Sequence, residues 1–528
     1  MSRFFTTEGP TKSSDHYTLS PLARLGLPRV RGLIDQKKYF VLHAPRQTGK
    51  TTCLLALRDH LNAEGKHFCV YANMEVAQGA RENLQESIPL ILREIAGKAT
   101  QLGDLNAAPL LEAVKASSGV VWSIADFLSR WCEGLKRPLV LLLDEVDSLV
   151  GDTLVMLLRH IRSGYDQRPG RFPQSVVLCG VRDVKDYRLR INGTKEIITG
   201  GSAFNIKAES LRLGDFTQED VLRLYRQHTD ETSQAFEPEA LALAWELTRG
   251  QPWLVNALAY EVCFRGGPGL ERSQPVTAAM ILSAKESLID RRVTHLNQLA
   301  DKLREERVRR VVETLLVGSE EPRDIPPDDL DYVEDLGLIR RKPTLAIANP
   351  IYREVIPREL TGSTQETIAQ ETAWYVLPDG RLDLEKLLTA FQEFFRQHSE
   401  HWVECFDYKE AGPQLLLQAF LQRIVNGGGR IEREYGLGRG RTDLLVIWPL
   451  RNGVQQAVIE LKLLRPRDSA SKVLEQGFKQ TLEYVDRSGG ASEAHLVIFD
   501  RDPKKTWEEK IYRRAEDRGG RRVVVWGM

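Results

Sequence analysis

The amino-acid sequence predicts an α/β protein whose N-terminal domain is built on a mostly parallel β-sheet. Apolar, strand-like segments alternate with helical segments over residues 1–205, which is typical of this fold class. Runs such as 138–143 are apolar at every position, as expected for strands that are buried on both faces. A loop at 44–49 joins the first apolar strand to a helix, and it contains the residue types of a phosphate-binding turn.

The elements of this first domain follow from their hydrophobic patterns. We expect strands at 39–43, 68–74, 138–143 and 175–180, and helices at 50–62, 80–97, 122–135 and 151–163. Residues 206–298 are expected to be helical, forming a lid domain. Thr217 as N-cap with Asp220 at N3 predicts one helix start, and Gly250-Gln251-Pro252 ends a helix at 237–248.

The remaining chain divides into three further parts. Helices followed by a short hairpin at 338–347 predict a winged helix over residues 299–361. Residues 362–399 combine a polar linker with an amphipathic helix at 384–397. Residues 400–528 predict a separate α/β domain. Its expected helices are 413–425 and 470–486, and its expected strands lie near 430–434, 443–449, 455–462, 494–499 and 521–526.

Composition limits the classes of function. A chain of 528 residues is too long for one hydrophobic core, and several domains are expected. Lys and Arg number 73, as do Asp and Glu, so any nucleic-acid site must be a local patch. The six cysteines form no CxxC pair, which argues against structural zinc and a disulfide framework. Without a signal-peptide core or an apolar run of ~20 residues, a reduced cytoplasm is the expected location.

The loop between the first strand and its helix has the chemistry of a nucleotide-binding site. Backbone N–H groups and the helix N-terminus cradle phosphates, Lys50 reaches the β- and γ-phosphates, and the Thr51 hydroxyl binds Mg²⁺. A plain surface turn does not account for strand, Gly-Lys-Thr and helix arriving together. ATP and Mg²⁺ are therefore the expected ligands. The contacting residues are Ala44, Pro45, Arg46, Gln47, Thr48, Gly49, Lys50, Thr51 and Thr52.

Two acidic residues end the third strand, where they would complete a hydrolytic site. Asp144 is placed to hold the Mg²⁺ shell, and Glu145 to orient or deprotonate the attacking water. The alternative is a pair of acidic N-caps for the following helix. Arg182 follows the next strand. Ligands of parallel sheets lie at the carboxyl ends of the strands, so Arg182 is expected near the nucleotide. It would sense the γ-phosphate, or else form a surface salt bridge with Asp183 or Asp186.

The order of these motifs resembles the STAND and archaeal-type branch of AAA+-related ATPases. Five features follow one another between residues 15 and 361: the loop, the Asp144-Glu145 pair, Arg182, Gly250-Gln251-Pro252 and a winged helix. In that branch a Gly-x-Pro of the lid packs near the nucleotide, so the resemblance implies that Pro252 contacts it. The His-containing motif that many members carry in the winged helix is missing here.

The C-terminal domain contains a second group of polar residues on apolar strands. Asn452-Gly453 between two apolar runs predicts a two-residue hairpin turn. In that register Leu445 faces Glu460 and Asp443 faces Lys462, so Asp443, Glu460 and Lys462 share one face. Carboxylates placed in this way suit Mg²⁺ or Mn²⁺, and a bound ion activates water for phosphodiester cleavage. The alternative is a cross-strand salt bridge.

Asp443 with Glu460-Leu461-Lys462 resembles the signature of the PD-(D/E)XK nuclease superfamily. On the helix that follows, Gln480 and Tyr484 are one turn apart, similar to the glutamine–tyrosine motif of the RecB-like branch. The resemblance covers residues 400–528 and implies a metal-dependent nuclease. It also implies an additional acidic metal ligand, for which Glu410 and Glu434 compete.

The combined prediction is an ATP-hydrolysing switch or motor coupled to a nuclease that acts on DNA. Clustered basic residues would neutralise phosphates, although acidic neighbours also fit a solvated surface. The clusters are Arg430, Arg433, Arg439, Arg441, Lys462, Arg465 and Arg467, and Arg340-Arg341-Lys342 in the wing. By analogy the fusion is similar to prokaryotic genome-defence effectors, with a homo-oligomer or a protein trigger open. The alternative is an ATP-dependent remodelling or regulatory protein whose C-terminal domain binds without cleaving.

Overall fold

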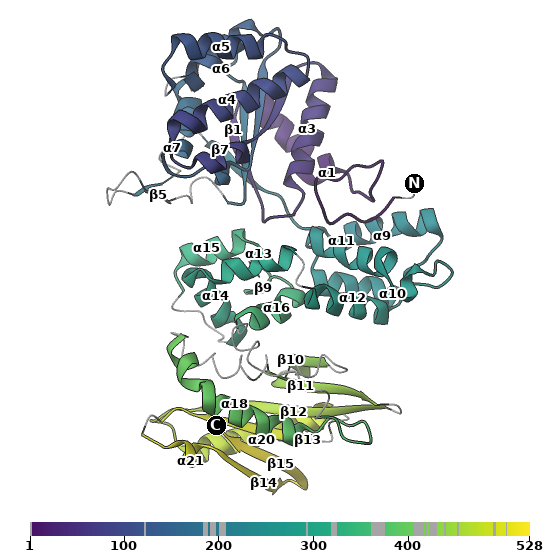
Figure 1. Cartoon of the computed structure of the whole chain (residues 1–528). Coiled ribbons are helices and arrows are strands. Elements are labelled where there is room, and N and C mark those ends of the chain that lie inside the picture. The colour runs from purple at the N-terminus through teal and green to yellow at the C-terminus, as the bar shows by residue number, and fades with distance from the viewer. Residues whose placement is uncertain are drawn as a thin grey trace. The chain divides into compact units, whose positions relative to one another are not determined.

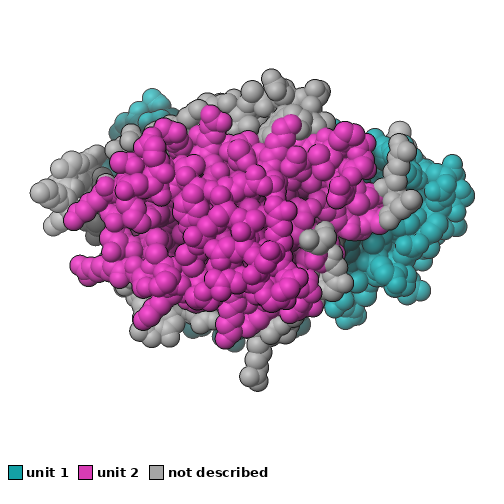
Figure 2. All heavy atoms as spheres, turned by 90° about the horizontal axis from the view of Figure 1, so that it is seen from below, with its two compact units in different colours: residues 1–298, 326–352 teal, residues 299–325, 353–528 magenta. Residues whose placement is uncertain are grey.

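The computed structural model describes two compact units, which Figure 2 colours separately. The first unit contains residues 1–298 and 326–352, and the second contains residues 299–325 and 353–528. The described residues are all except 1–2, 121–122, 183–187, 191–196, 200–206, 292–293, 318–324, 361–374, 406–416, 418–419, 422–429, 438–439, 451–452, 489–490, 492 and 503.

The first unit is built on a five-stranded parallel sheet (Figure 1), which confirms the predicted fold class. The strand order is β2-β3-β4-β1-β7. Four strands match the expected ones: β1 Tyr39–His43, β2 Phe68–Asn73, β3 Leu139–Asp144 and β4 Ser175–Gly180. The fifth differs from expectation. Residues after 206 were expected to be helical, but Lys207–Arg212 forms β7 beside β1.

Helices cover both faces of this sheet, and its strands are therefore buried on both sides. Residues at alternate positions of the strands point to opposite cores. One core involves α1 Pro21–Leu25, α2 Leu27–Asp35 and α3 Lys50–Glu64. The opposite core involves η1 Met74–Ala80, α4 Leu84–Gln101, α5 Ala107–Ser117, α6 Ser123–Gly134 and α7 Gly151–Ser163. Short elements complete this part: η3 Val146–Ser148, η4 Tyr165–Gln167, β5 Arg188–Arg190 and β6 Ile197–Thr199.

The predicted helical lid begins at the expected cap. The hydroxyl of Thr217 accepts the N–H of Asp220 at 3.1 Å, and the Asp220 carboxylate accepts the N–H of Thr217 at 3.0 Å. Gly250 has a φ of 81°, and a Cβ there would lie 2.0 Å from the carbonyl oxygen of Phe216, so only glycine fits. The elements are α9 Gln218–Thr232, α10 Pro238–Thr248, α11 Pro252–Tyr260, η6 Glu261–Arg265, η7 Pro268–Leu270 and α12 Ala278–Asp290.

The region predicted as a winged helix contains helices and a short hairpin. Ile339 pairs with Ile347 and Arg340 with Ala346. The elements are α13 Thr294–Leu303, α14 Glu306–Val317, α15 Pro327–Asp335, β8 Ile339–Arg340, β9 Ala346–Ile347 and α16 Pro350–Leu360. The winged-helix assignment itself stays a prediction. No helix in the described part of the chain combines the length and apolar character needed to cross a bilayer.

The C-terminal part of the second unit is a six-stranded mixed sheet in the order β10-β11-β12-β13-β15-β14. One face packs on α20 through an apolar cluster that includes Phe478 and Leu496. On the other face Phe391 and Phe395 of α18 contact the ring of Phe499. The elements are α18 Leu384–Cys405, β10 Arg430–Leu437, β11 Gly440–Leu450, β12 Gly453–Leu464, α20 Ala470–Ser488, β13 Glu493–Asp500, α21 Trp507–Lys510, β14 Tyr512–Arg518 and β15 Arg521–Gly527.

The predicted register of the β11–β12 hairpin is wrong by two residues. Leu445 pairs with Val458 and not with Glu460, and Leu450 pairs with Gly453. Gly453 therefore belongs to the strand, with a φ of 136°. A shift of two residues preserves the side-chain alternation, so the predicted common face survives. Continuing this register by one residue would place Asp443 opposite Glu460.

Candidate functional site

The loop between β1 and α3 has a backbone shape that its residue types permit. Gln47 and Gly49 have φ angles of 59° and 91°, both left-handed. A side chain at Gly49 would be strained by this φ, whereas the nearest atom to a Cβ there, an Nη of Arg24 at 2.9 Å, belongs to a flexible side chain that can move away. Gly49 is the N-cap of α3, and the N-terminus of this helix of 15 residues therefore opens onto the loop. Such a terminus suits a phosphate group.

Lys50 places a buried positive charge inside this loop. Its side chain is 5% exposed, and its ammonium group donates to the carbonyl oxygens of Ala44 at 3.0 Å and Pro45 at 3.1 Å. A buried cation needs compensating oxygen atoms. The carbonyl oxygens of the loop supply them and hold the ammonium group within the loop.

Asp144 connects the loop to the neighbouring strands. It is fully buried at the end of β3, where its Oδ2 accepts hydrogen bonds from Thr51 Oγ1 at 2.7 Å and Tyr71 OH at 3.0 Å. Its Oδ1 accepts the backbone N–H of Glu145 at 3.0 Å. The hydroxyl and carboxylate oxygens of Thr51 and Asp144 are hard donors of the kind that Mg²⁺ prefers. The residues present thus fit a magnesium ion.

Glu145 has an unusual backbone conformation and an altered acidity. Its φ of 52° is left-handed, which is uncommon for a residue with a side chain and costs on the order of 1 kcal/mol. Burial raises the pKa of its carboxyl group, as do the negative charges of Asp147 and Asp144, while Lys50 and Arg46 oppose the rise. A carboxylate with a raised pKa is a better proton acceptor, as a general base requires.

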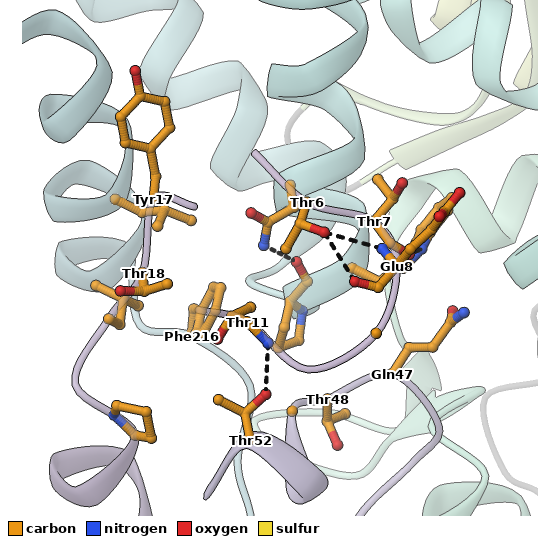
Figure 3. Close-up of a pocket in the computed structure, with 18 of the residues that line it drawn as sticks. Thr6, Thr7, Glu8, Thr11, Tyr17, Thr18, Gln47, Thr48, Thr52 and Phe216 are labelled. Atoms are coloured by element: carbon orange, nitrogen blue, oxygen red, sulfur yellow. Dashed lines mark hydrogen bonds between the residues drawn. The ribbon is translucent and has the colours of Figure 1, made fainter. Parts of the chain in front are cut away.

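A cavity of about 570 Å³ in the first unit borders the loop. Figure 3 shows Gln47, Thr48 and Thr52 on one side and Thr7 and Glu8 of the N-terminal segment on the other. Pro252, Trp253 and Asn256 of α11 also line it. The volume lies in the range of small-molecule sites, and the loop gives it a phosphate-binding end.

The N-terminal segment, residues 3–18, forms one wall of this cavity. Its Thr11 N–H donates to Thr52 Oγ1 at 3.2 Å (Figure 3), and its Thr7 carbonyl accepts the indole N–H of Trp253 at 3.0 Å. The segment is anchored by the buried Phe5, whose ring centroid lies 4.8 Å from that of Tyr17. It therefore links the start of α3 to the helical lid.

His295 of α13 lies against Gln47 of the loop and is buried, with 8% of its surface exposed. Its Nδ1 bonds to Gln47 Oε1 and its Nε2 to the Tyr352 hydroxyl at 2.5 Å. Because an amide oxygen only accepts, Nδ1 carries the proton and Nε2 accepts from the tyrosine. The ring stacks on Trp253 at 4.7 Å. Burial lowers the pKa of His295 to about 4, so it is neutral near pH 7.

A second cavity, of about 840 Å³, borders Glu145. It is also lined by Arg46 of the loop, by Glu75 and Arg81 from the segment after β2, and by Asp147. Glu145 therefore opens onto a cavity that is not lined by residues of α11.

The C-terminal sheet brings two of the predicted nuclease residues into contact. Lys462 Nζ donates to Glu460 Oε1 at 2.6 Å, and Glu460 is 2% exposed. Gln480 on α20 has a buried Oε1 without a hydrogen-bond partner among the described residues, whereas Tyr484 packs in the apolar core. In the part of the chain that the structure describes, His, Cys, Asp and Glu form no group of three that could hold a metal.

Comparison with known protein families matches residues 33–355 to the family described as AAA-like domain, which is more than half of the 528 residues. The chain belongs to this family. The domain that matches is called the AAA-like domain below.

Solved structures similar in fold include the Walker-type ATPase of Pyrococcus abyssi, at 13% identity and a TM-score of 0.43, covering 67% of this chain and 99% of that chain. The RuvB Holliday junction branch migration motor of Thermotoga maritima has 14% identity and a TM-score of 0.33, covering 64% and 93%. Domain III of the Thermotoga maritima replication initiation protein DnaA has 14% identity and a TM-score of 0.32, covering 52% and 97%. No curated protein matches the chain.

The predicted nucleotide residues of the AAA-like domain lie together in the structure. Lys50 and Thr51 begin α3 beside Asp144, and Pro252 lines the same cavity as Thr52. Arg182 follows β4 as expected, but its guanidinium lies over the ring of Tyr332 at 4.8 Å. Its role as a γ-phosphate sensor stays a prediction, as do the roles of the other site residues.

Of the predicted nuclease residues, Glu410 and the side chains of Asp443 and Glu434 lie outside the described residues. Their contribution to a metal site stays a prediction. Most of the helix expected at 413–425 also falls outside the described residues.

Sequence reasoning missed several residues around the cavity of the AAA-like domain. Arg24, Trp253, Asn256 and His295 carry no recognisable motif, and they come from three separate helices, α1, α11 and α13. Among them, only Trp253 could have been inferred from the sequence, because it directly follows Pro252, a predicted nucleotide contact. The N-terminal segment was not expected to take part at all.

Proposed function

We propose that the AAA-like domain binds ATP with Mg²⁺ and hydrolyses it. The observation that carries this proposal is the contact between the Thr51 hydroxyl and the Asp144 carboxylate, at 2.7 Å, beside the buried ammonium group of Lys50. A helix N-terminus, a lysine and two Mg²⁺-type oxygen donors at one place are the parts that phosphoryl transfer needs. Membership of the AAA-like domain family supports the same function.

Each residue has a chemical task in this proposal. Thr51 and Asp144 would hold Mg²⁺, which when bound neutralises charge on the phosphates. Lys50 binds phosphate oxygens through its ammonium group. Glu145 orients a water molecule and accepts its proton, and Arg182 lies near the end of β4 as a candidate for stabilising γ-phosphate charge.

Measurement of phosphate release from ATP tests this function. The wild-type protein should release phosphate in the presence of Mg²⁺, and Asp144→Asn should slow release at least about a hundredfold because it removes a negative charge at the proposed metal site. Asp59→Asn is a matched control that should retain the activity, since Asp59 is an exposed carboxylate of α3 that lines neither cavity. Unchanged turnover in Asp144→Asn would refute the assignment.

A second candidate function, a metal-dependent nuclease acting on DNA, rests on the Glu460–Lys462 pair. A carboxylate that is 2% exposed and a lysine 2.6 Å away on one strand face match the proposed catalytic arrangement. Asp443 stands on the neighbouring strand, in line with Glu460 if the register continues. Asp443 and Glu460 would hold Mg²⁺ or Mn²⁺, and Lys462 would steady the attacking hydroxide or the phosphate charge.

A cleavage panel of single- and double-stranded DNA and RNA with Mg²⁺ or Mn²⁺ tests the nuclease. Wild type should cut DNA, and Glu460→Gln should not. Glu475→Gln is a suitable control, because Glu475 is an exposed carboxylate of α20 in the same unit. If no polynucleotide is cut while ATP turnover is normal, the second unit is a binding module and the protein remodels or regulates a partner.

Joining both activities gives an ATP-governed DNA nuclease, with prokaryotic genome defence as the biological setting we propose. A trigger protein and self-association belong to the same proposal. The arrangement of one AAA-like domain and one candidate nuclease site in a single chain supports it.

A further inference from the structure

The cavity beside the phosphate-binding loop contains a hydrogen-bond acceptor that no described donor satisfies. Asn256 of α11 lines this cavity and is 8% exposed. Its Nδ2 donates to the carbonyl oxygen of Pro252 at 2.8 Å, which fixes the orientation of the amide. Its Oδ1 is buried and accepts no hydrogen bond from the described residues.

A buried acceptor without a donor is unfavourable, so a ligand that brings a donor gains from meeting it. Other polar groups of the same wall are already engaged. The Trp253 indole N–H donates to the Thr7 carbonyl at 3.0 Å, and the Tyr17 hydroxyl bonds to His228 at 3.3 Å. Asn256 Oδ1 is therefore a buried acceptor that the described residues leave without a donor.

The surroundings of Asn256 suit a planar base. Tyr17, Phe216, Leu224 and Trp253 line the same cavity, and rings and aliphatic groups favour stacking on a nucleobase over contact with a hydrated sugar. Gln47, Thr48 and Gly49 of the loop line it as well. The cavity thus combines the phosphate-binding loop with aromatic and aliphatic side chains, and Asn256 lines it together with them.

We propose that Asn256 Oδ1 accepts a hydrogen bond from the exocyclic amino group of the bound nucleobase. The cavity then selects adenine over purines that lack this group. A 6-oxo purine would set its carbonyl oxygen against Oδ1, acceptor against acceptor. The proposal rests on the nucleotide binding proposed above and adds the residue that recognises the base.

Equilibrium binding of three triphosphates to the full chain with Mg²⁺ tests this proposal. Wild type should bind ATP about tenfold more tightly than purine riboside triphosphate, which lacks the amino group, and inosine triphosphate should bind no better than the latter. Asn256→Leu, similar in size but without an acceptor, should bind ATP only as tightly as purine riboside triphosphate. The exposed Asn106→Leu is the matched control and should keep the tenfold preference.

Equal binding of ATP and purine riboside triphosphate by wild type would overturn the proposal, and this comparison needs no variant. A preference that persists in Asn256→Leu would overturn it as well. If wild type instead discriminates against 2′-deoxy- or 3′-deoxy-ATP and Asn256→Leu does not, the acceptor recognises ribose and the base assignment is wrong. Failure of wild type to bind any of the triphosphates would refute the proposed function, which is a different result.

Discussion

Lys50 is a buried ammonium group whose present partners are two carbonyl oxygens, at 3.0 and 3.1 Å. Neutral carbonyls compensate a buried charge less well than phosphate oxygens, because an opposite charge interacts more strongly at low dielectric. Bound triphosphate should therefore gain much of its affinity from this residue.

Lys50→Ala should weaken ATP binding by at least about tenfold and remove most of the hydrolysis, since one charge-assisted contact is worth roughly 1.5–3 kcal/mol. Calorimetric titration and a phosphate-release assay measure the two effects. Lys66→Ala provides the control, because Lys66 is an exposed lysine of the same unit. Equal losses in both variants would mean that Lys50 has no special role.

Glu145 should control the pH dependence of hydrolysis. Burial raises the pKa of its carboxyl group, and the residue works as a base only when deprotonated. The rate at saturating ATP should therefore fall as pH decreases, with a midpoint above the usual range for glutamate. Glu145→Gln should bind ATP normally and hydrolyse it at least about a hundredfold more slowly.

The control for Glu145 is Glu75→Gln, since Glu75 is exposed and lines the same second cavity. It should preserve both the rate and the pH profile. Hydrolysis by Glu145→Gln at the wild-type rate would contradict the role of general base.

Site residues could be predicted from the sequence where a local motif determines their position. They could not be predicted where only tertiary contacts bring them to the site. Lys50 and Asp144 follow apolar strands within short, specific motifs, so their positions could be inferred. Asn256 and His295 meet the site only after helices far apart in the chain have packed together. Nothing in their immediate sequence signals that contact.

Elements of regular structure follow the same division. β3 and β4 are continuous apolar runs and were predicted within one residue. Lys207–Arg212 was missed because its sequence, KAESLR, has no apolar run, and its pairing with β1 depends on tertiary structure. The β11–β12 register failed because the Asn-Gly rule places both residues in the turn, while Gly453 joins the strand.

α13 connects to the loop through His295, and this contact should respond to acid. The pKa of His295 falls from 6.5 to about 4 on burial, so the unfolded state takes up the proton first. The contribution of neutral His295 to the free energy of unfolding is therefore complete above pH 6.5. It is lost as the pH decreases toward 4, and the total loss is roughly 3 kcal/mol. His295→Gln lacks the titrating group, so its thermal unfolding midpoint should decline less steeply over this range.

The comparison for His295→Gln is His60→Gln, which removes a partly exposed histidine from α3. That variant should keep the wild-type slope of unfolding midpoint against pH. Parallel slopes for His295→Gln and wild type would show that His295 does not contribute to the acid sensitivity.

The whole molecule combines an AAA-like domain with a second unit whose sheet carries the Glu460–Lys462 pair. The family match covers residues 33–355, and the C-terminal sheet lies beyond them. We propose that the two activities are coupled, and two variants of the first unit separate the possible forms of this coupling. Lys50→Ala should bind ATP at least about tenfold more weakly, whereas Glu145→Gln should bind ATP normally and hydrolyse it at least about a hundredfold more slowly.

DNA cleavage by the three proteins, with and without ATP, tests the coupling. If bound ATP is the signal, Glu145→Gln should cut as well as wild type in the presence of ATP, while Lys50→Ala should show no response to it. If turnover is required, both variants should lose the ATP-dependent part of the cleavage, because neither completes hydrolysis. Glu460→Gln supplies the background in each case. Cleavage that is indifferent to ATP in all three proteins would mean that the two sites work independently within one chain.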